Sequence, residues 1–324
     1  MKAIFILLFS TSAFAIGLQN EVIYGIDNRL PLESYSEIDF KWKSTSIAMM
    51  VRKNNLEDSF GGILTKVRGN TLENQYSVCS NEPNAQDLIF GNCTGFLVGP
   101  DLLATAGHCA SSSYSCKEDY KWIFEFRDDL ILDSGIKNEV YISSKNVYGC
   151  KEIVHREYDY SSKLDFALIR LDRPVLDRPV LAIRTKGQIE NDAELVLIGH
   201  PIGLPLKVAS NGLIIDNINP IFFKTNLDSF VGNSGSPVFN KKTGLVEGIL
   251  VRGESDFVTD EENNCERLHF CPENGQGCDG EEATRITQIP ELMESPISPQ
   301  EDPAPVTEDS GSFNWDCFFS NEGC

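Results

Sequence analysis

The chain has 324 residues, and 28 Lys and Arg stand against 48 Asp and Glu, for a formal net charge of −20. So acidic a surface repels nucleic acid and anionic lipid, and we expect neither as a partner. After the amino-terminal end, no run approaches the roughly 18 apolar residues that a membrane-spanning helix needs, so we expect no membrane anchor.

The first fifteen residues have the pattern of a secretory signal peptide. Lys2 supplies the positive end, residues 3–9 are apolar, and Ala13-Phe14-Ala15 has the small-x-small form of a cleavage site. We therefore expect a secreted or periplasmic protein. The ten cysteines fit that destination, because oxidising compartments preserve disulfides. None falls in a Cys-x-x-Cys pair of the kind that holds zinc, and we expect no metal site.

Short apolar runs follow one another from Ser44 to Gly253, broken by Gly, Pro, Asn and Asp. No long stretch in this region has the period of a helix. Regularly spaced short strands with turn signals indicate an all-β sandwich or barrel. The clearest runs are residues 96–98, 122–126, 140–142, 195–198 and 248–251.

Two of the apolar runs carry residues with catalytic chemistry. His108, one of four histidines, ends the run 103–109 as Gly-His-Cys, and Asp165 is embedded in the run 163–171. A serine hydroxyl becomes a good nucleophile when a histidine, oriented by a carboxylate, stands beside it. The other histidines are weaker candidates. His155 and His269 lie in charged, loop-like surroundings, and His200 lies in a turn where a structural hydrogen bond is the simpler account.

The matching serine lies in the segment Gly232-Asn233-Ser234-Gly235-Ser236-Pro237. Glycines on both sides of a serine let the backbone turn tightly and bring amide N–H groups close to whatever contacts the hydroxyl. Such donors can hold a developing oxyanion. Taken alone, this composition is also common in surface turns.

In the order His, Asp, Ser, these motifs resemble the chymotrypsin-like (trypsin-like) serine peptidases over residues 22–292. The form Gly-Asn-Ser-Gly-Ser-Pro is similar to the bacterial branch that includes glutamyl endopeptidases. The resemblance implies an all-β fold of two six-stranded antiparallel β-barrels over residues 22–294, with the active site between them. It further implies polypeptide substrates, a monomer, and neither a metal nor an organic cofactor.

The resemblance also assigns roles residue by residue. Ser234 is the nucleophile, His108 the general base and then acid, and Asp165 the carboxylate that fixes the imidazole tautomer. The N–H groups of Gly232 and Ser234 form the oxyanion hole. Cysteines placed like Cys93 and Cys109 form a bridge that pins the histidine loop. The remaining eight cysteines allow 105 connectivities, and the sequence does not choose among them.

Substrate preference follows less directly. Asp228, six residues before Ser234, occupies the position whose acid gives trypsin-like members a preference for Arg or Lys before the cut bond (P1), through a charge-assisted contact. Against this, Arg252 precedes Gly253 in the strand that should line the substrate groove. If Arg252 turns inward, it neutralises Asp228 or favours acidic side chains. Basic, acidic and small apolar P1 residues all stay open, with basic ones favoured.

Three positions depart from the family pattern. Leu250 is apolar where glutamyl-specific relatives carry a pocket histidine, and Val251 replaces a serine that supports the triad aspartate in many relatives. Asn233 is neutral where animal members have the aspartate that pairs with a new amino terminus, which puts that activation route in doubt. The segment from Val22 resembles the mature start of the bacterial branch, so residues 16–21 are a candidate pro-piece.

The carboxyl-terminal segment, residues 295–324, differs in composition from the rest. Pro, Glu, Asp and Ser dominate up to Ser312, too polar to bury a core. An aromatic end with Cys317 and Cys324 follows. We expect a linker and a tail that is frayed but tied by one disulfide, with docking, a small loop or sorting as alternatives.

We thus predict an exported serine endopeptidase that works through an acyl-enzyme. One rival is a catalytically silent double barrel kept as a binding or adhesion module, against which the complete triad argues. Another is a protease–chaperone, which would need an appended peptide-binding domain longer than this tail.

Overall fold

The structure, a computed structural model, describes residues 22–294. The predicted signal peptide (1–15), the candidate pro-piece (16–21) and the tail (295–324) lie outside the described residues.

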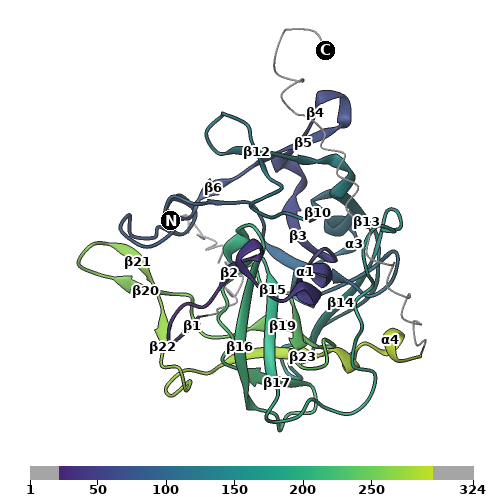
Figure 1. Ribbon diagram of the computed structural model, residues 1–324, viewed down its shortest axis with the longest axis vertical. Helices are drawn as coiled ribbons and strands as arrows, with labels where there is room; N and C mark the ends of the chain where they lie inside the picture. The colour runs from purple at the N-terminus through teal and green to yellow at the C-terminus, as the bar shows by residue number, and fades with distance from the viewer. Residues whose placement is uncertain (1–21, 295–324) are drawn as a thin grey trace, which may run out of the picture.

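Two closed, six-stranded antiparallel barrels form the body of the protein, which confirms the predicted fold (Figure 1). The first barrel closes in the order β10-β13-β14-β9-β8-β3. Its strands are β3 (Ile47–Arg52), β8 (Cys93–Leu97), β9 (Leu102–Thr105), β10 (Tyr120–Phe124), β13 (Val147–Tyr158) and β14 (Asp165–Leu171).

The second barrel runs β15-β18-β19-β23-β17-β16, and β16 closes it by pairing back to β15. Its strands are β15 (Glu194–Gly199), β16 (Lys207–Asp216), β17 (Phe222–Thr225), β18 (Pro237–Asn240), β19 (Val246–Arg252) and β23 (Glu281–Arg285). The short β2 (Leu30–Pro31) adds to β16.

One apolar core joins the two barrels. Phe96 and Trp122 of the first barrel belong to the same contiguous cluster as Phe239 of the second. The helix α1 (Ile38–Ser44) strengthens this junction, because its Phe40 packs edge-to-face on Phe239 with ring centroids 5.5 Å apart. Close packing of this kind fixes the two barrels against each other, so that loops from both can build one site at the seam.

Smaller strands and helices lie outside the two barrels. A four-stranded sheet of order β11-β12-β5-β4 lies at the upper end of the view, and the β20–β21 hairpin projects at its left edge (Figure 1). The longest helix has seven residues, as the lack of helical period predicts. The strands are β1 (Ile23–Tyr24), β4 (Leu56–Ser59), β5 (Leu64–Arg68), β6 (Asn70–Thr71), β7 (Leu88–Ile89), β11 (Leu132–Asp133), β12 (Glu139–Ser143), β20 (Phe257–Asp260), β21 (Cys265–Leu268) and β22 (Phe270–Cys271). The helices are α1, α2 (Leu72–Tyr76), α3 (Ser113–Glu118) and α4 (Pro290–Glu294), with 3-10 turns η1 (Leu32–Ser34), η2 (Lys53–Asn55), η3 (Phe60–Gly62), η4 (Gly107–Cys109), η5 (Ser144–Asn146), η6 (Pro201–Gly203) and η7 (Ile286–Gln288).

Four disulfides cross-link the described residues, and they leave none of the cysteines there free. The Cys93–Cys109 bridge confirms the pairing that the family resemblance implies. The other three are Cys79–Cys265, Cys116–Cys150 and Cys271–Cys278. Cys317 and Cys324 lie outside the described residues.

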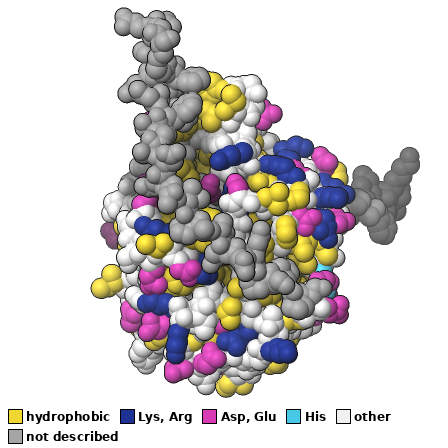
Figure 2. Space-filling view, turned by 45° about the vertical axis from the view of Figure 1, so that its right-hand side comes forward, with side chains coloured by type: hydrophobic (Ala, Val, Ile, Leu, Met, Phe, Trp, Pro, Cys, Tyr) yellow, Lys and Arg dark blue, Asp and Glu magenta, His cyan; other side chains and the backbone are white. Residues whose placement is uncertain are grey.

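Charges of both signs are intermixed on the face shown in Figure 2, where Lys and Arg side chains lie among Asp and Glu. Mixed charge suits a solvated surface. Among the helices of residues 22–294, none combines the length and apolar character needed to cross a membrane.

Candidate active site

His108 and Asp165 meet at the ends of two paired strands. β14 pairs with β9 through Ala167 and Thr105, so that Asp165 at the start of β14 lies beside the turn η4 that follows β9. His108 Nδ1 lies 2.8 Å from Asp165 Oδ2, and the His108 backbone N–H donates to Asp165 Oδ1 over 3.0 Å. The Asp165 side chain is fully buried. An ionised carboxylate only accepts hydrogen bonds, so this contact places the proton on Nδ1 and leaves Nε2 as an acceptor.

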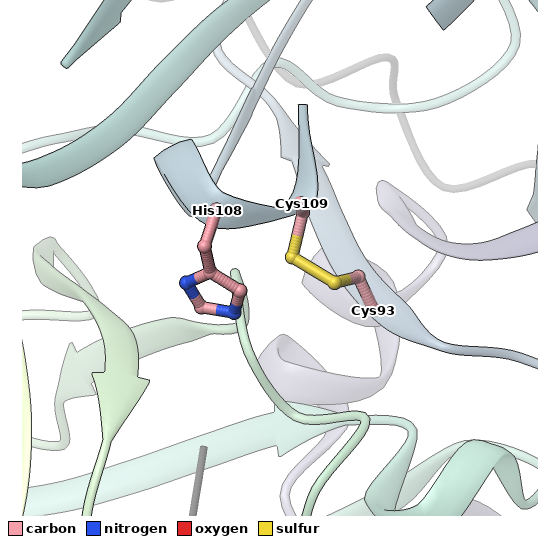
Figure 3. Close-up of side chains that lie close together, drawn as sticks. All are labelled: Cys93, His108 and Cys109. Carbon is pink, nitrogen blue, oxygen red and sulfur yellow. A yellow bond between two sulfur atoms is a disulfide. The ribbon is translucent and has the colours of Figure 1, made fainter. Parts of the chain in front are cut away.

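The Cys93–Cys109 bridge holds the histidine turn against β8. Figure 3 shows His108 and Cys109 leaving the same short turn, with the disulfide running from Cys109 to Cys93. Although one nitrogen of His108 lies near both sulfurs, the sulfurs are bonded to each other and are not thiolate ligands. The bridge therefore restrains the imidazole and does not form a metal centre with it.

The serine loop depends on the two glycines that the sequence places around Ser234. Gly232 and Gly235 have φ values of 101° and 92°, a region that residues with a Cβ rarely adopt. A Cβ on Gly235 would lie 2.0 Å from the Thr94 carbonyl oxygen, and one on Gly232 would lie 2.6 Å from the His200 carbonyl oxygen. Glycine is thus required at both positions by conformation and by space.

The structure brings Ser234 to the histidine turn through its backbone. The Thr94 N–H donates to the Ser234 carbonyl oxygen over 2.8 Å, and Cys109 Sγ lies 3.7 Å from the same oxygen. Since Cys109 follows His108 directly, the serine loop of the second barrel lies against the histidine turn of the first. Ser234 itself is 2 % exposed.

Two buried threonines, which sequence reasoning missed, tie this loop to the first barrel. Thr94 Oγ1 donates to the Gly232 carbonyl oxygen over 2.8 Å, and Thr105 Oγ1 donates to the Thr94 carbonyl oxygen over 2.6 Å. Both hydroxyls belong to fully buried residues in apolar strands. A polar residue inside an apolar run was the one available signal, and many structural threonines share it.

The Asp228 carboxylate is buried against the amino-terminal segment. Its side chain oxygens accept from the backbone N–H groups of Tyr24 (2.7 Å) and Asn28 (2.9 Å), and the residue is 1 % exposed. Burial raises the pKa of the Asp228 carboxyl to about 6, although these two hydrogen bonds oppose the shift. Asp228 anchors the amino-terminal segment, because both its oxygens are occupied by that segment.

The Arg252 guanidinium lies on the Asp165 side of the seam. Nε donates to Glu282 over 2.7 Å, Nη2 donates to the Lys163 carbonyl oxygen over 2.5 Å, and Nη1 lies 3.9 Å from Asp165 Oδ2. The sequence leaves open whether Arg252 turns inward toward Asp228, and these three partners lie beside Asp165 instead.

The carboxylate nearest to Gly253 is that of Glu281, which sequence reasoning missed. A Cβ on Gly253 would lie 2.1 Å from Glu281 Oε2, so the carboxylate packs directly on this glycine. Glu281 is fully buried. Burial, followed by the charges of Glu281 and Glu254, raises the pKa of Tyr24, which places that phenol among the same acids. No local pattern distinguished Glu281 from the other acids of its strand.

The remaining histidines have structural partners. His200 Nδ1 lies 3.0 Å from the Leu204 carbonyl oxygen, which confirms the structural hydrogen bond expected of that turn. His269 Nδ1 lies 2.8 Å from the Ser255 carbonyl oxygen. His155 contacts Glu291 of α4 and Glu157 of its own strand.

The seam of the double barrel thus holds a buried Asp–His pair and a glycine-flanked serine. In agreement, residues 93–249 match the family model of the trypsin-like peptidase domain, and they include His108, Asp165 and Ser234.

Two solved structures of proteases match most of the length of the chain. One is the VesB protease of Vibrio cholerae, with 15 % sequence identity, a TM-score of 0.46, and coverage of 83 % of this chain and 67 % of that one. Another is a Glu endopeptidase in complex with MPD, with 16 % identity, a TM-score of 0.44, and coverage of 85 % of this chain and 100 % of the other. The comparison with curated proteins found no match.

Proposed function

We propose that the protein is an exported serine endopeptidase that hydrolyses peptide bonds through an acyl-enzyme. The observation that carries the proposal is the contact of the buried Asp165 carboxylate with both the ring and the backbone of His108, beside the loop of Ser234. A histidine held in this tautomer presents Nε2 as the base that a serine nucleophile needs.

The reaction follows from these roles. Ser234 Oγ attacks the scissile carbonyl carbon and gives its proton to His108 Nε2, while the N–H groups of Gly232 and Ser234 hold the oxyanion. His108 then passes the proton to the leaving amine as the C–N bond breaks. Water repeats the sequence on the ester, and the acid product leaves with Ser234 restored.

Export is part of the proposal. The four disulfides fit an oxidising compartment outside the cytosol. Residues 1–15 supply the signal peptide that the sequence predicts. Residues 22–294 form the peptidase domain, and residues 295–324 the linker and tail.

The preference for basic P1 residues stays a prediction, but Glu281 replaces Asp228 as the acid that supports it. Glu281 is buried against Gly253 in the predicted groove. A Lys or Arg side chain entering there would meet this carboxylate in a site of low dielectric, where opposite charges attract strongly. Tyr24 lies close to the same acids. Its side chain would therefore either contact the P1 side chain or move aside as that side chain enters.

A P1-scanning peptide library tests the activity and the preference together. Mature protein starting at Val22 is assayed beside Ser234→Ala, which should lose about four orders of magnitude in kcat/KM or more while it stays folded. A fluorophosphonate probe should label the parent and not the variant. Absence of Ser234-dependent cleavage and labelling would favour the binding-module alternative.

Glu281→Gln tests the pocket separately. We expect it to reduce kcat/KM for Arg and Lys substrates by about tenfold or more, with little change for an uncharged P1 residue. Glu194→Gln, at an exposed acid at the start of β15, serves as the matched control. Equal losses for charged and uncharged substrates would remove Glu281 from the specificity site and leave the triad assignment intact.

A further inference from the structure

A β-bulge aims Arg252 away from the interior of the second barrel. β19 pairs with β23 through Leu250 and Ala283, but the next pair is Arg252 with Glu282, so Val251 is an extra residue on β19. In a regular strand Arg252 would share the face of Leu250. The bulge instead places it on the face of Glu282, because an inserted residue reverses the alternation of side chains.

Three contacts then fix the guanidinium beside Asp165. Glu282 Oε2 accepts from Nε over 2.7 Å, and the Lys163 carbonyl oxygen accepts from Nη2 over 2.5 Å. Lys163 has a φ of 66° in the turn that leads into β14. Arg252 thus braces the turn two residues before Asp165, and its Nη1 lies 3.9 Å from Asp165 Oδ2.

Burial strengthens the electrostatic interaction between Arg252 and Asp165. The Asp165 side chain is fully buried and that of Arg252 is 19 % exposed, so water screens the pair poorly. At 3.9 Å the contact is an ion pair and not a hydrogen bond, and both Asp165 oxygens keep their bonds to His108. The cation therefore acts on the electrostatics of the Asp–His pair without displacing either partner.

Other charged groups lie around the pair, and Glu282 is the main counter-ion of Arg252. Glu282 forms ion pairs with both Arg252 and Lys224, whose Nζ lies 3.5 Å from Glu282 Oε1. On the remaining side, Arg156 donates to the Gly107 carbonyl oxygen over 2.7 Å, next to His108. The titratable and charged groups that face the pair are Arg156 and Tyr158 of β13, Arg252 of β19 and Glu282 of β23. Lys163, in the turn before β14, faces Arg252 with its backbone carbonyl, and its ammonium lies over the Tyr160 ring.

We infer that Arg252 is a positioning residue for Asp165 and sets the pH at which His108 gives up its proton. The inference rests on the proposed function and deepens it. A cation beside Asp165 weakens the negative field that stabilises the His108 imidazolium.

The test is the acid limb of the kcat/KM profile in three variants. Arg252→Gln should move its midpoint to higher pH by about 0.5 unit, since the imidazolium gains stability when the cation is lost. Glu282→Gln should move it to lower pH, because Arg252 loses its main counter-ion. Arg252→Lys keeps the charge without the planar fork, and should fall between the parent and Arg252→Gln.

Arg170→Gln is the matched control. Arg170 lies five residues along the same strand, paired with Asp101 and Glu152, roughly 17 Å from Asp165 at strand spacing. At that distance salt screens its charge, so the midpoint should not move. If Arg170→Gln shifts the midpoint as much as Arg252→Gln does, the effect is one of net charge and the inference fails.

A second readout separates this inference from the proposed function. The His108 ring is titrated by NMR in a Ser234→Ala background, with and without Arg252→Gln, and needs no turnover. A higher midpoint in the double variant upholds the role of Arg252 even if the parent cleaves nothing. An unchanged midpoint overturns it, even if the parent is an active peptidase and Arg252→Gln lowers kcat through a structural effect.

Discussion

At the scale of single residues, burial alone changes the chemistry of His200. The residue is 1 % exposed, and burial lowers the pKa of its imidazole to about 4. Its Nδ1 faces a carbonyl oxygen, which can only accept, so the neutral ring with a proton on Nδ1 is the form that the fold selects. The Gly-His-Pro turn therefore needs no catalytic role to explain its histidine.

This neutral histidine predicts a loss of stability in mild acid. Between about pH 6.5 and 4 the unfolded chain binds a proton at His200 and the native state does not, so the free energy of unfolding falls as the pH drops. The full difference is roughly 3 kcal/mol. His200→Asn should flatten the dependence of urea-unfolding free energy on pH in this window.

Asp228 changes the free energy of unfolding with pH in the opposite direction to His200. The effect of His200 must therefore be measured by comparing a variant with the parent. Its pKa is raised to about 6, so its contribution to stability is present below its unfolded value and is lost as the pH rises through 6. The slope of the parent protein is the difference between the two effects. A pH slope in His200→Asn equal to that of the parent would contradict the assignment of acid sensitivity to His200.

At the scale of elements, the sequence predicts those features that depend on residues close together in the chain. Glycines beside Ser234 specify a turn, and apolar runs with turn residues specify strands, so the barrels and the seam residues could be predicted. The orientation of the Arg252 side chain could not be predicted, because one extra residue in β19 places it on the opposite face of the strand. The partners of Asp228 could not be predicted for a related reason, because Tyr24 and Asn28 lie about 200 residues away in the chain.

The disulfide beneath the histidine turn should matter to activity more than to folding alone. Removing Cys93–Cys109 with a pair of alanines releases a loop with a sequence separation of 16, which should cost about 3 kcal/mol. It should also lower kcat, since η4 loses its link to β8. Thermal unfolding and peptide cleavage measure the two effects.

Cys116–Cys150 provides the control for that experiment. It ties α3 to β13 and closes a comparable loop, with a sequence separation of 34. Its removal should lower the melting temperature by a similar amount while kcat is retained at temperatures where the protein stays folded. Equal losses of kcat in both double variants would mean that the histidine turn needs no bridge of its own.

At the scale of the whole molecule, Asp228 joins the amino-terminal segment to the second barrel. Val22 and Ile23 are fully buried, and β1 runs parallel to β22. Asp228→Ala should therefore raise the hydrogen-exchange rates of the Tyr24 and Asn28 amides by roughly tenfold or more, since each loses its acceptor. The amide of Gly25, which donates to Cys271, should change less. If the exchange rates of the Tyr24 and Asn28 amides are the same in Asp228→Ala as in the parent, then packing, and not Asp228, holds the segment.

The Cys79–Cys265 bridge has a consequence for the order of assembly. Its two sulfurs are separated by 186 positions, and four cysteines that pair with one another lie between them. As the chain emerges from the amino-terminal end, Cys79 must stay reduced while Cys93, Cys109, Cys116 and Cys150 pass and find their partners. Its own partner arrives only after all of β19 has been made. The disulfide between the β20–β21 hairpin and the loop after α2 thus closes late, after Cys93–Cys109 and Cys116–Cys150 can form. A Cys79 thiol oxidised too early would leave the chain in a mispaired form that disulfide exchange must correct.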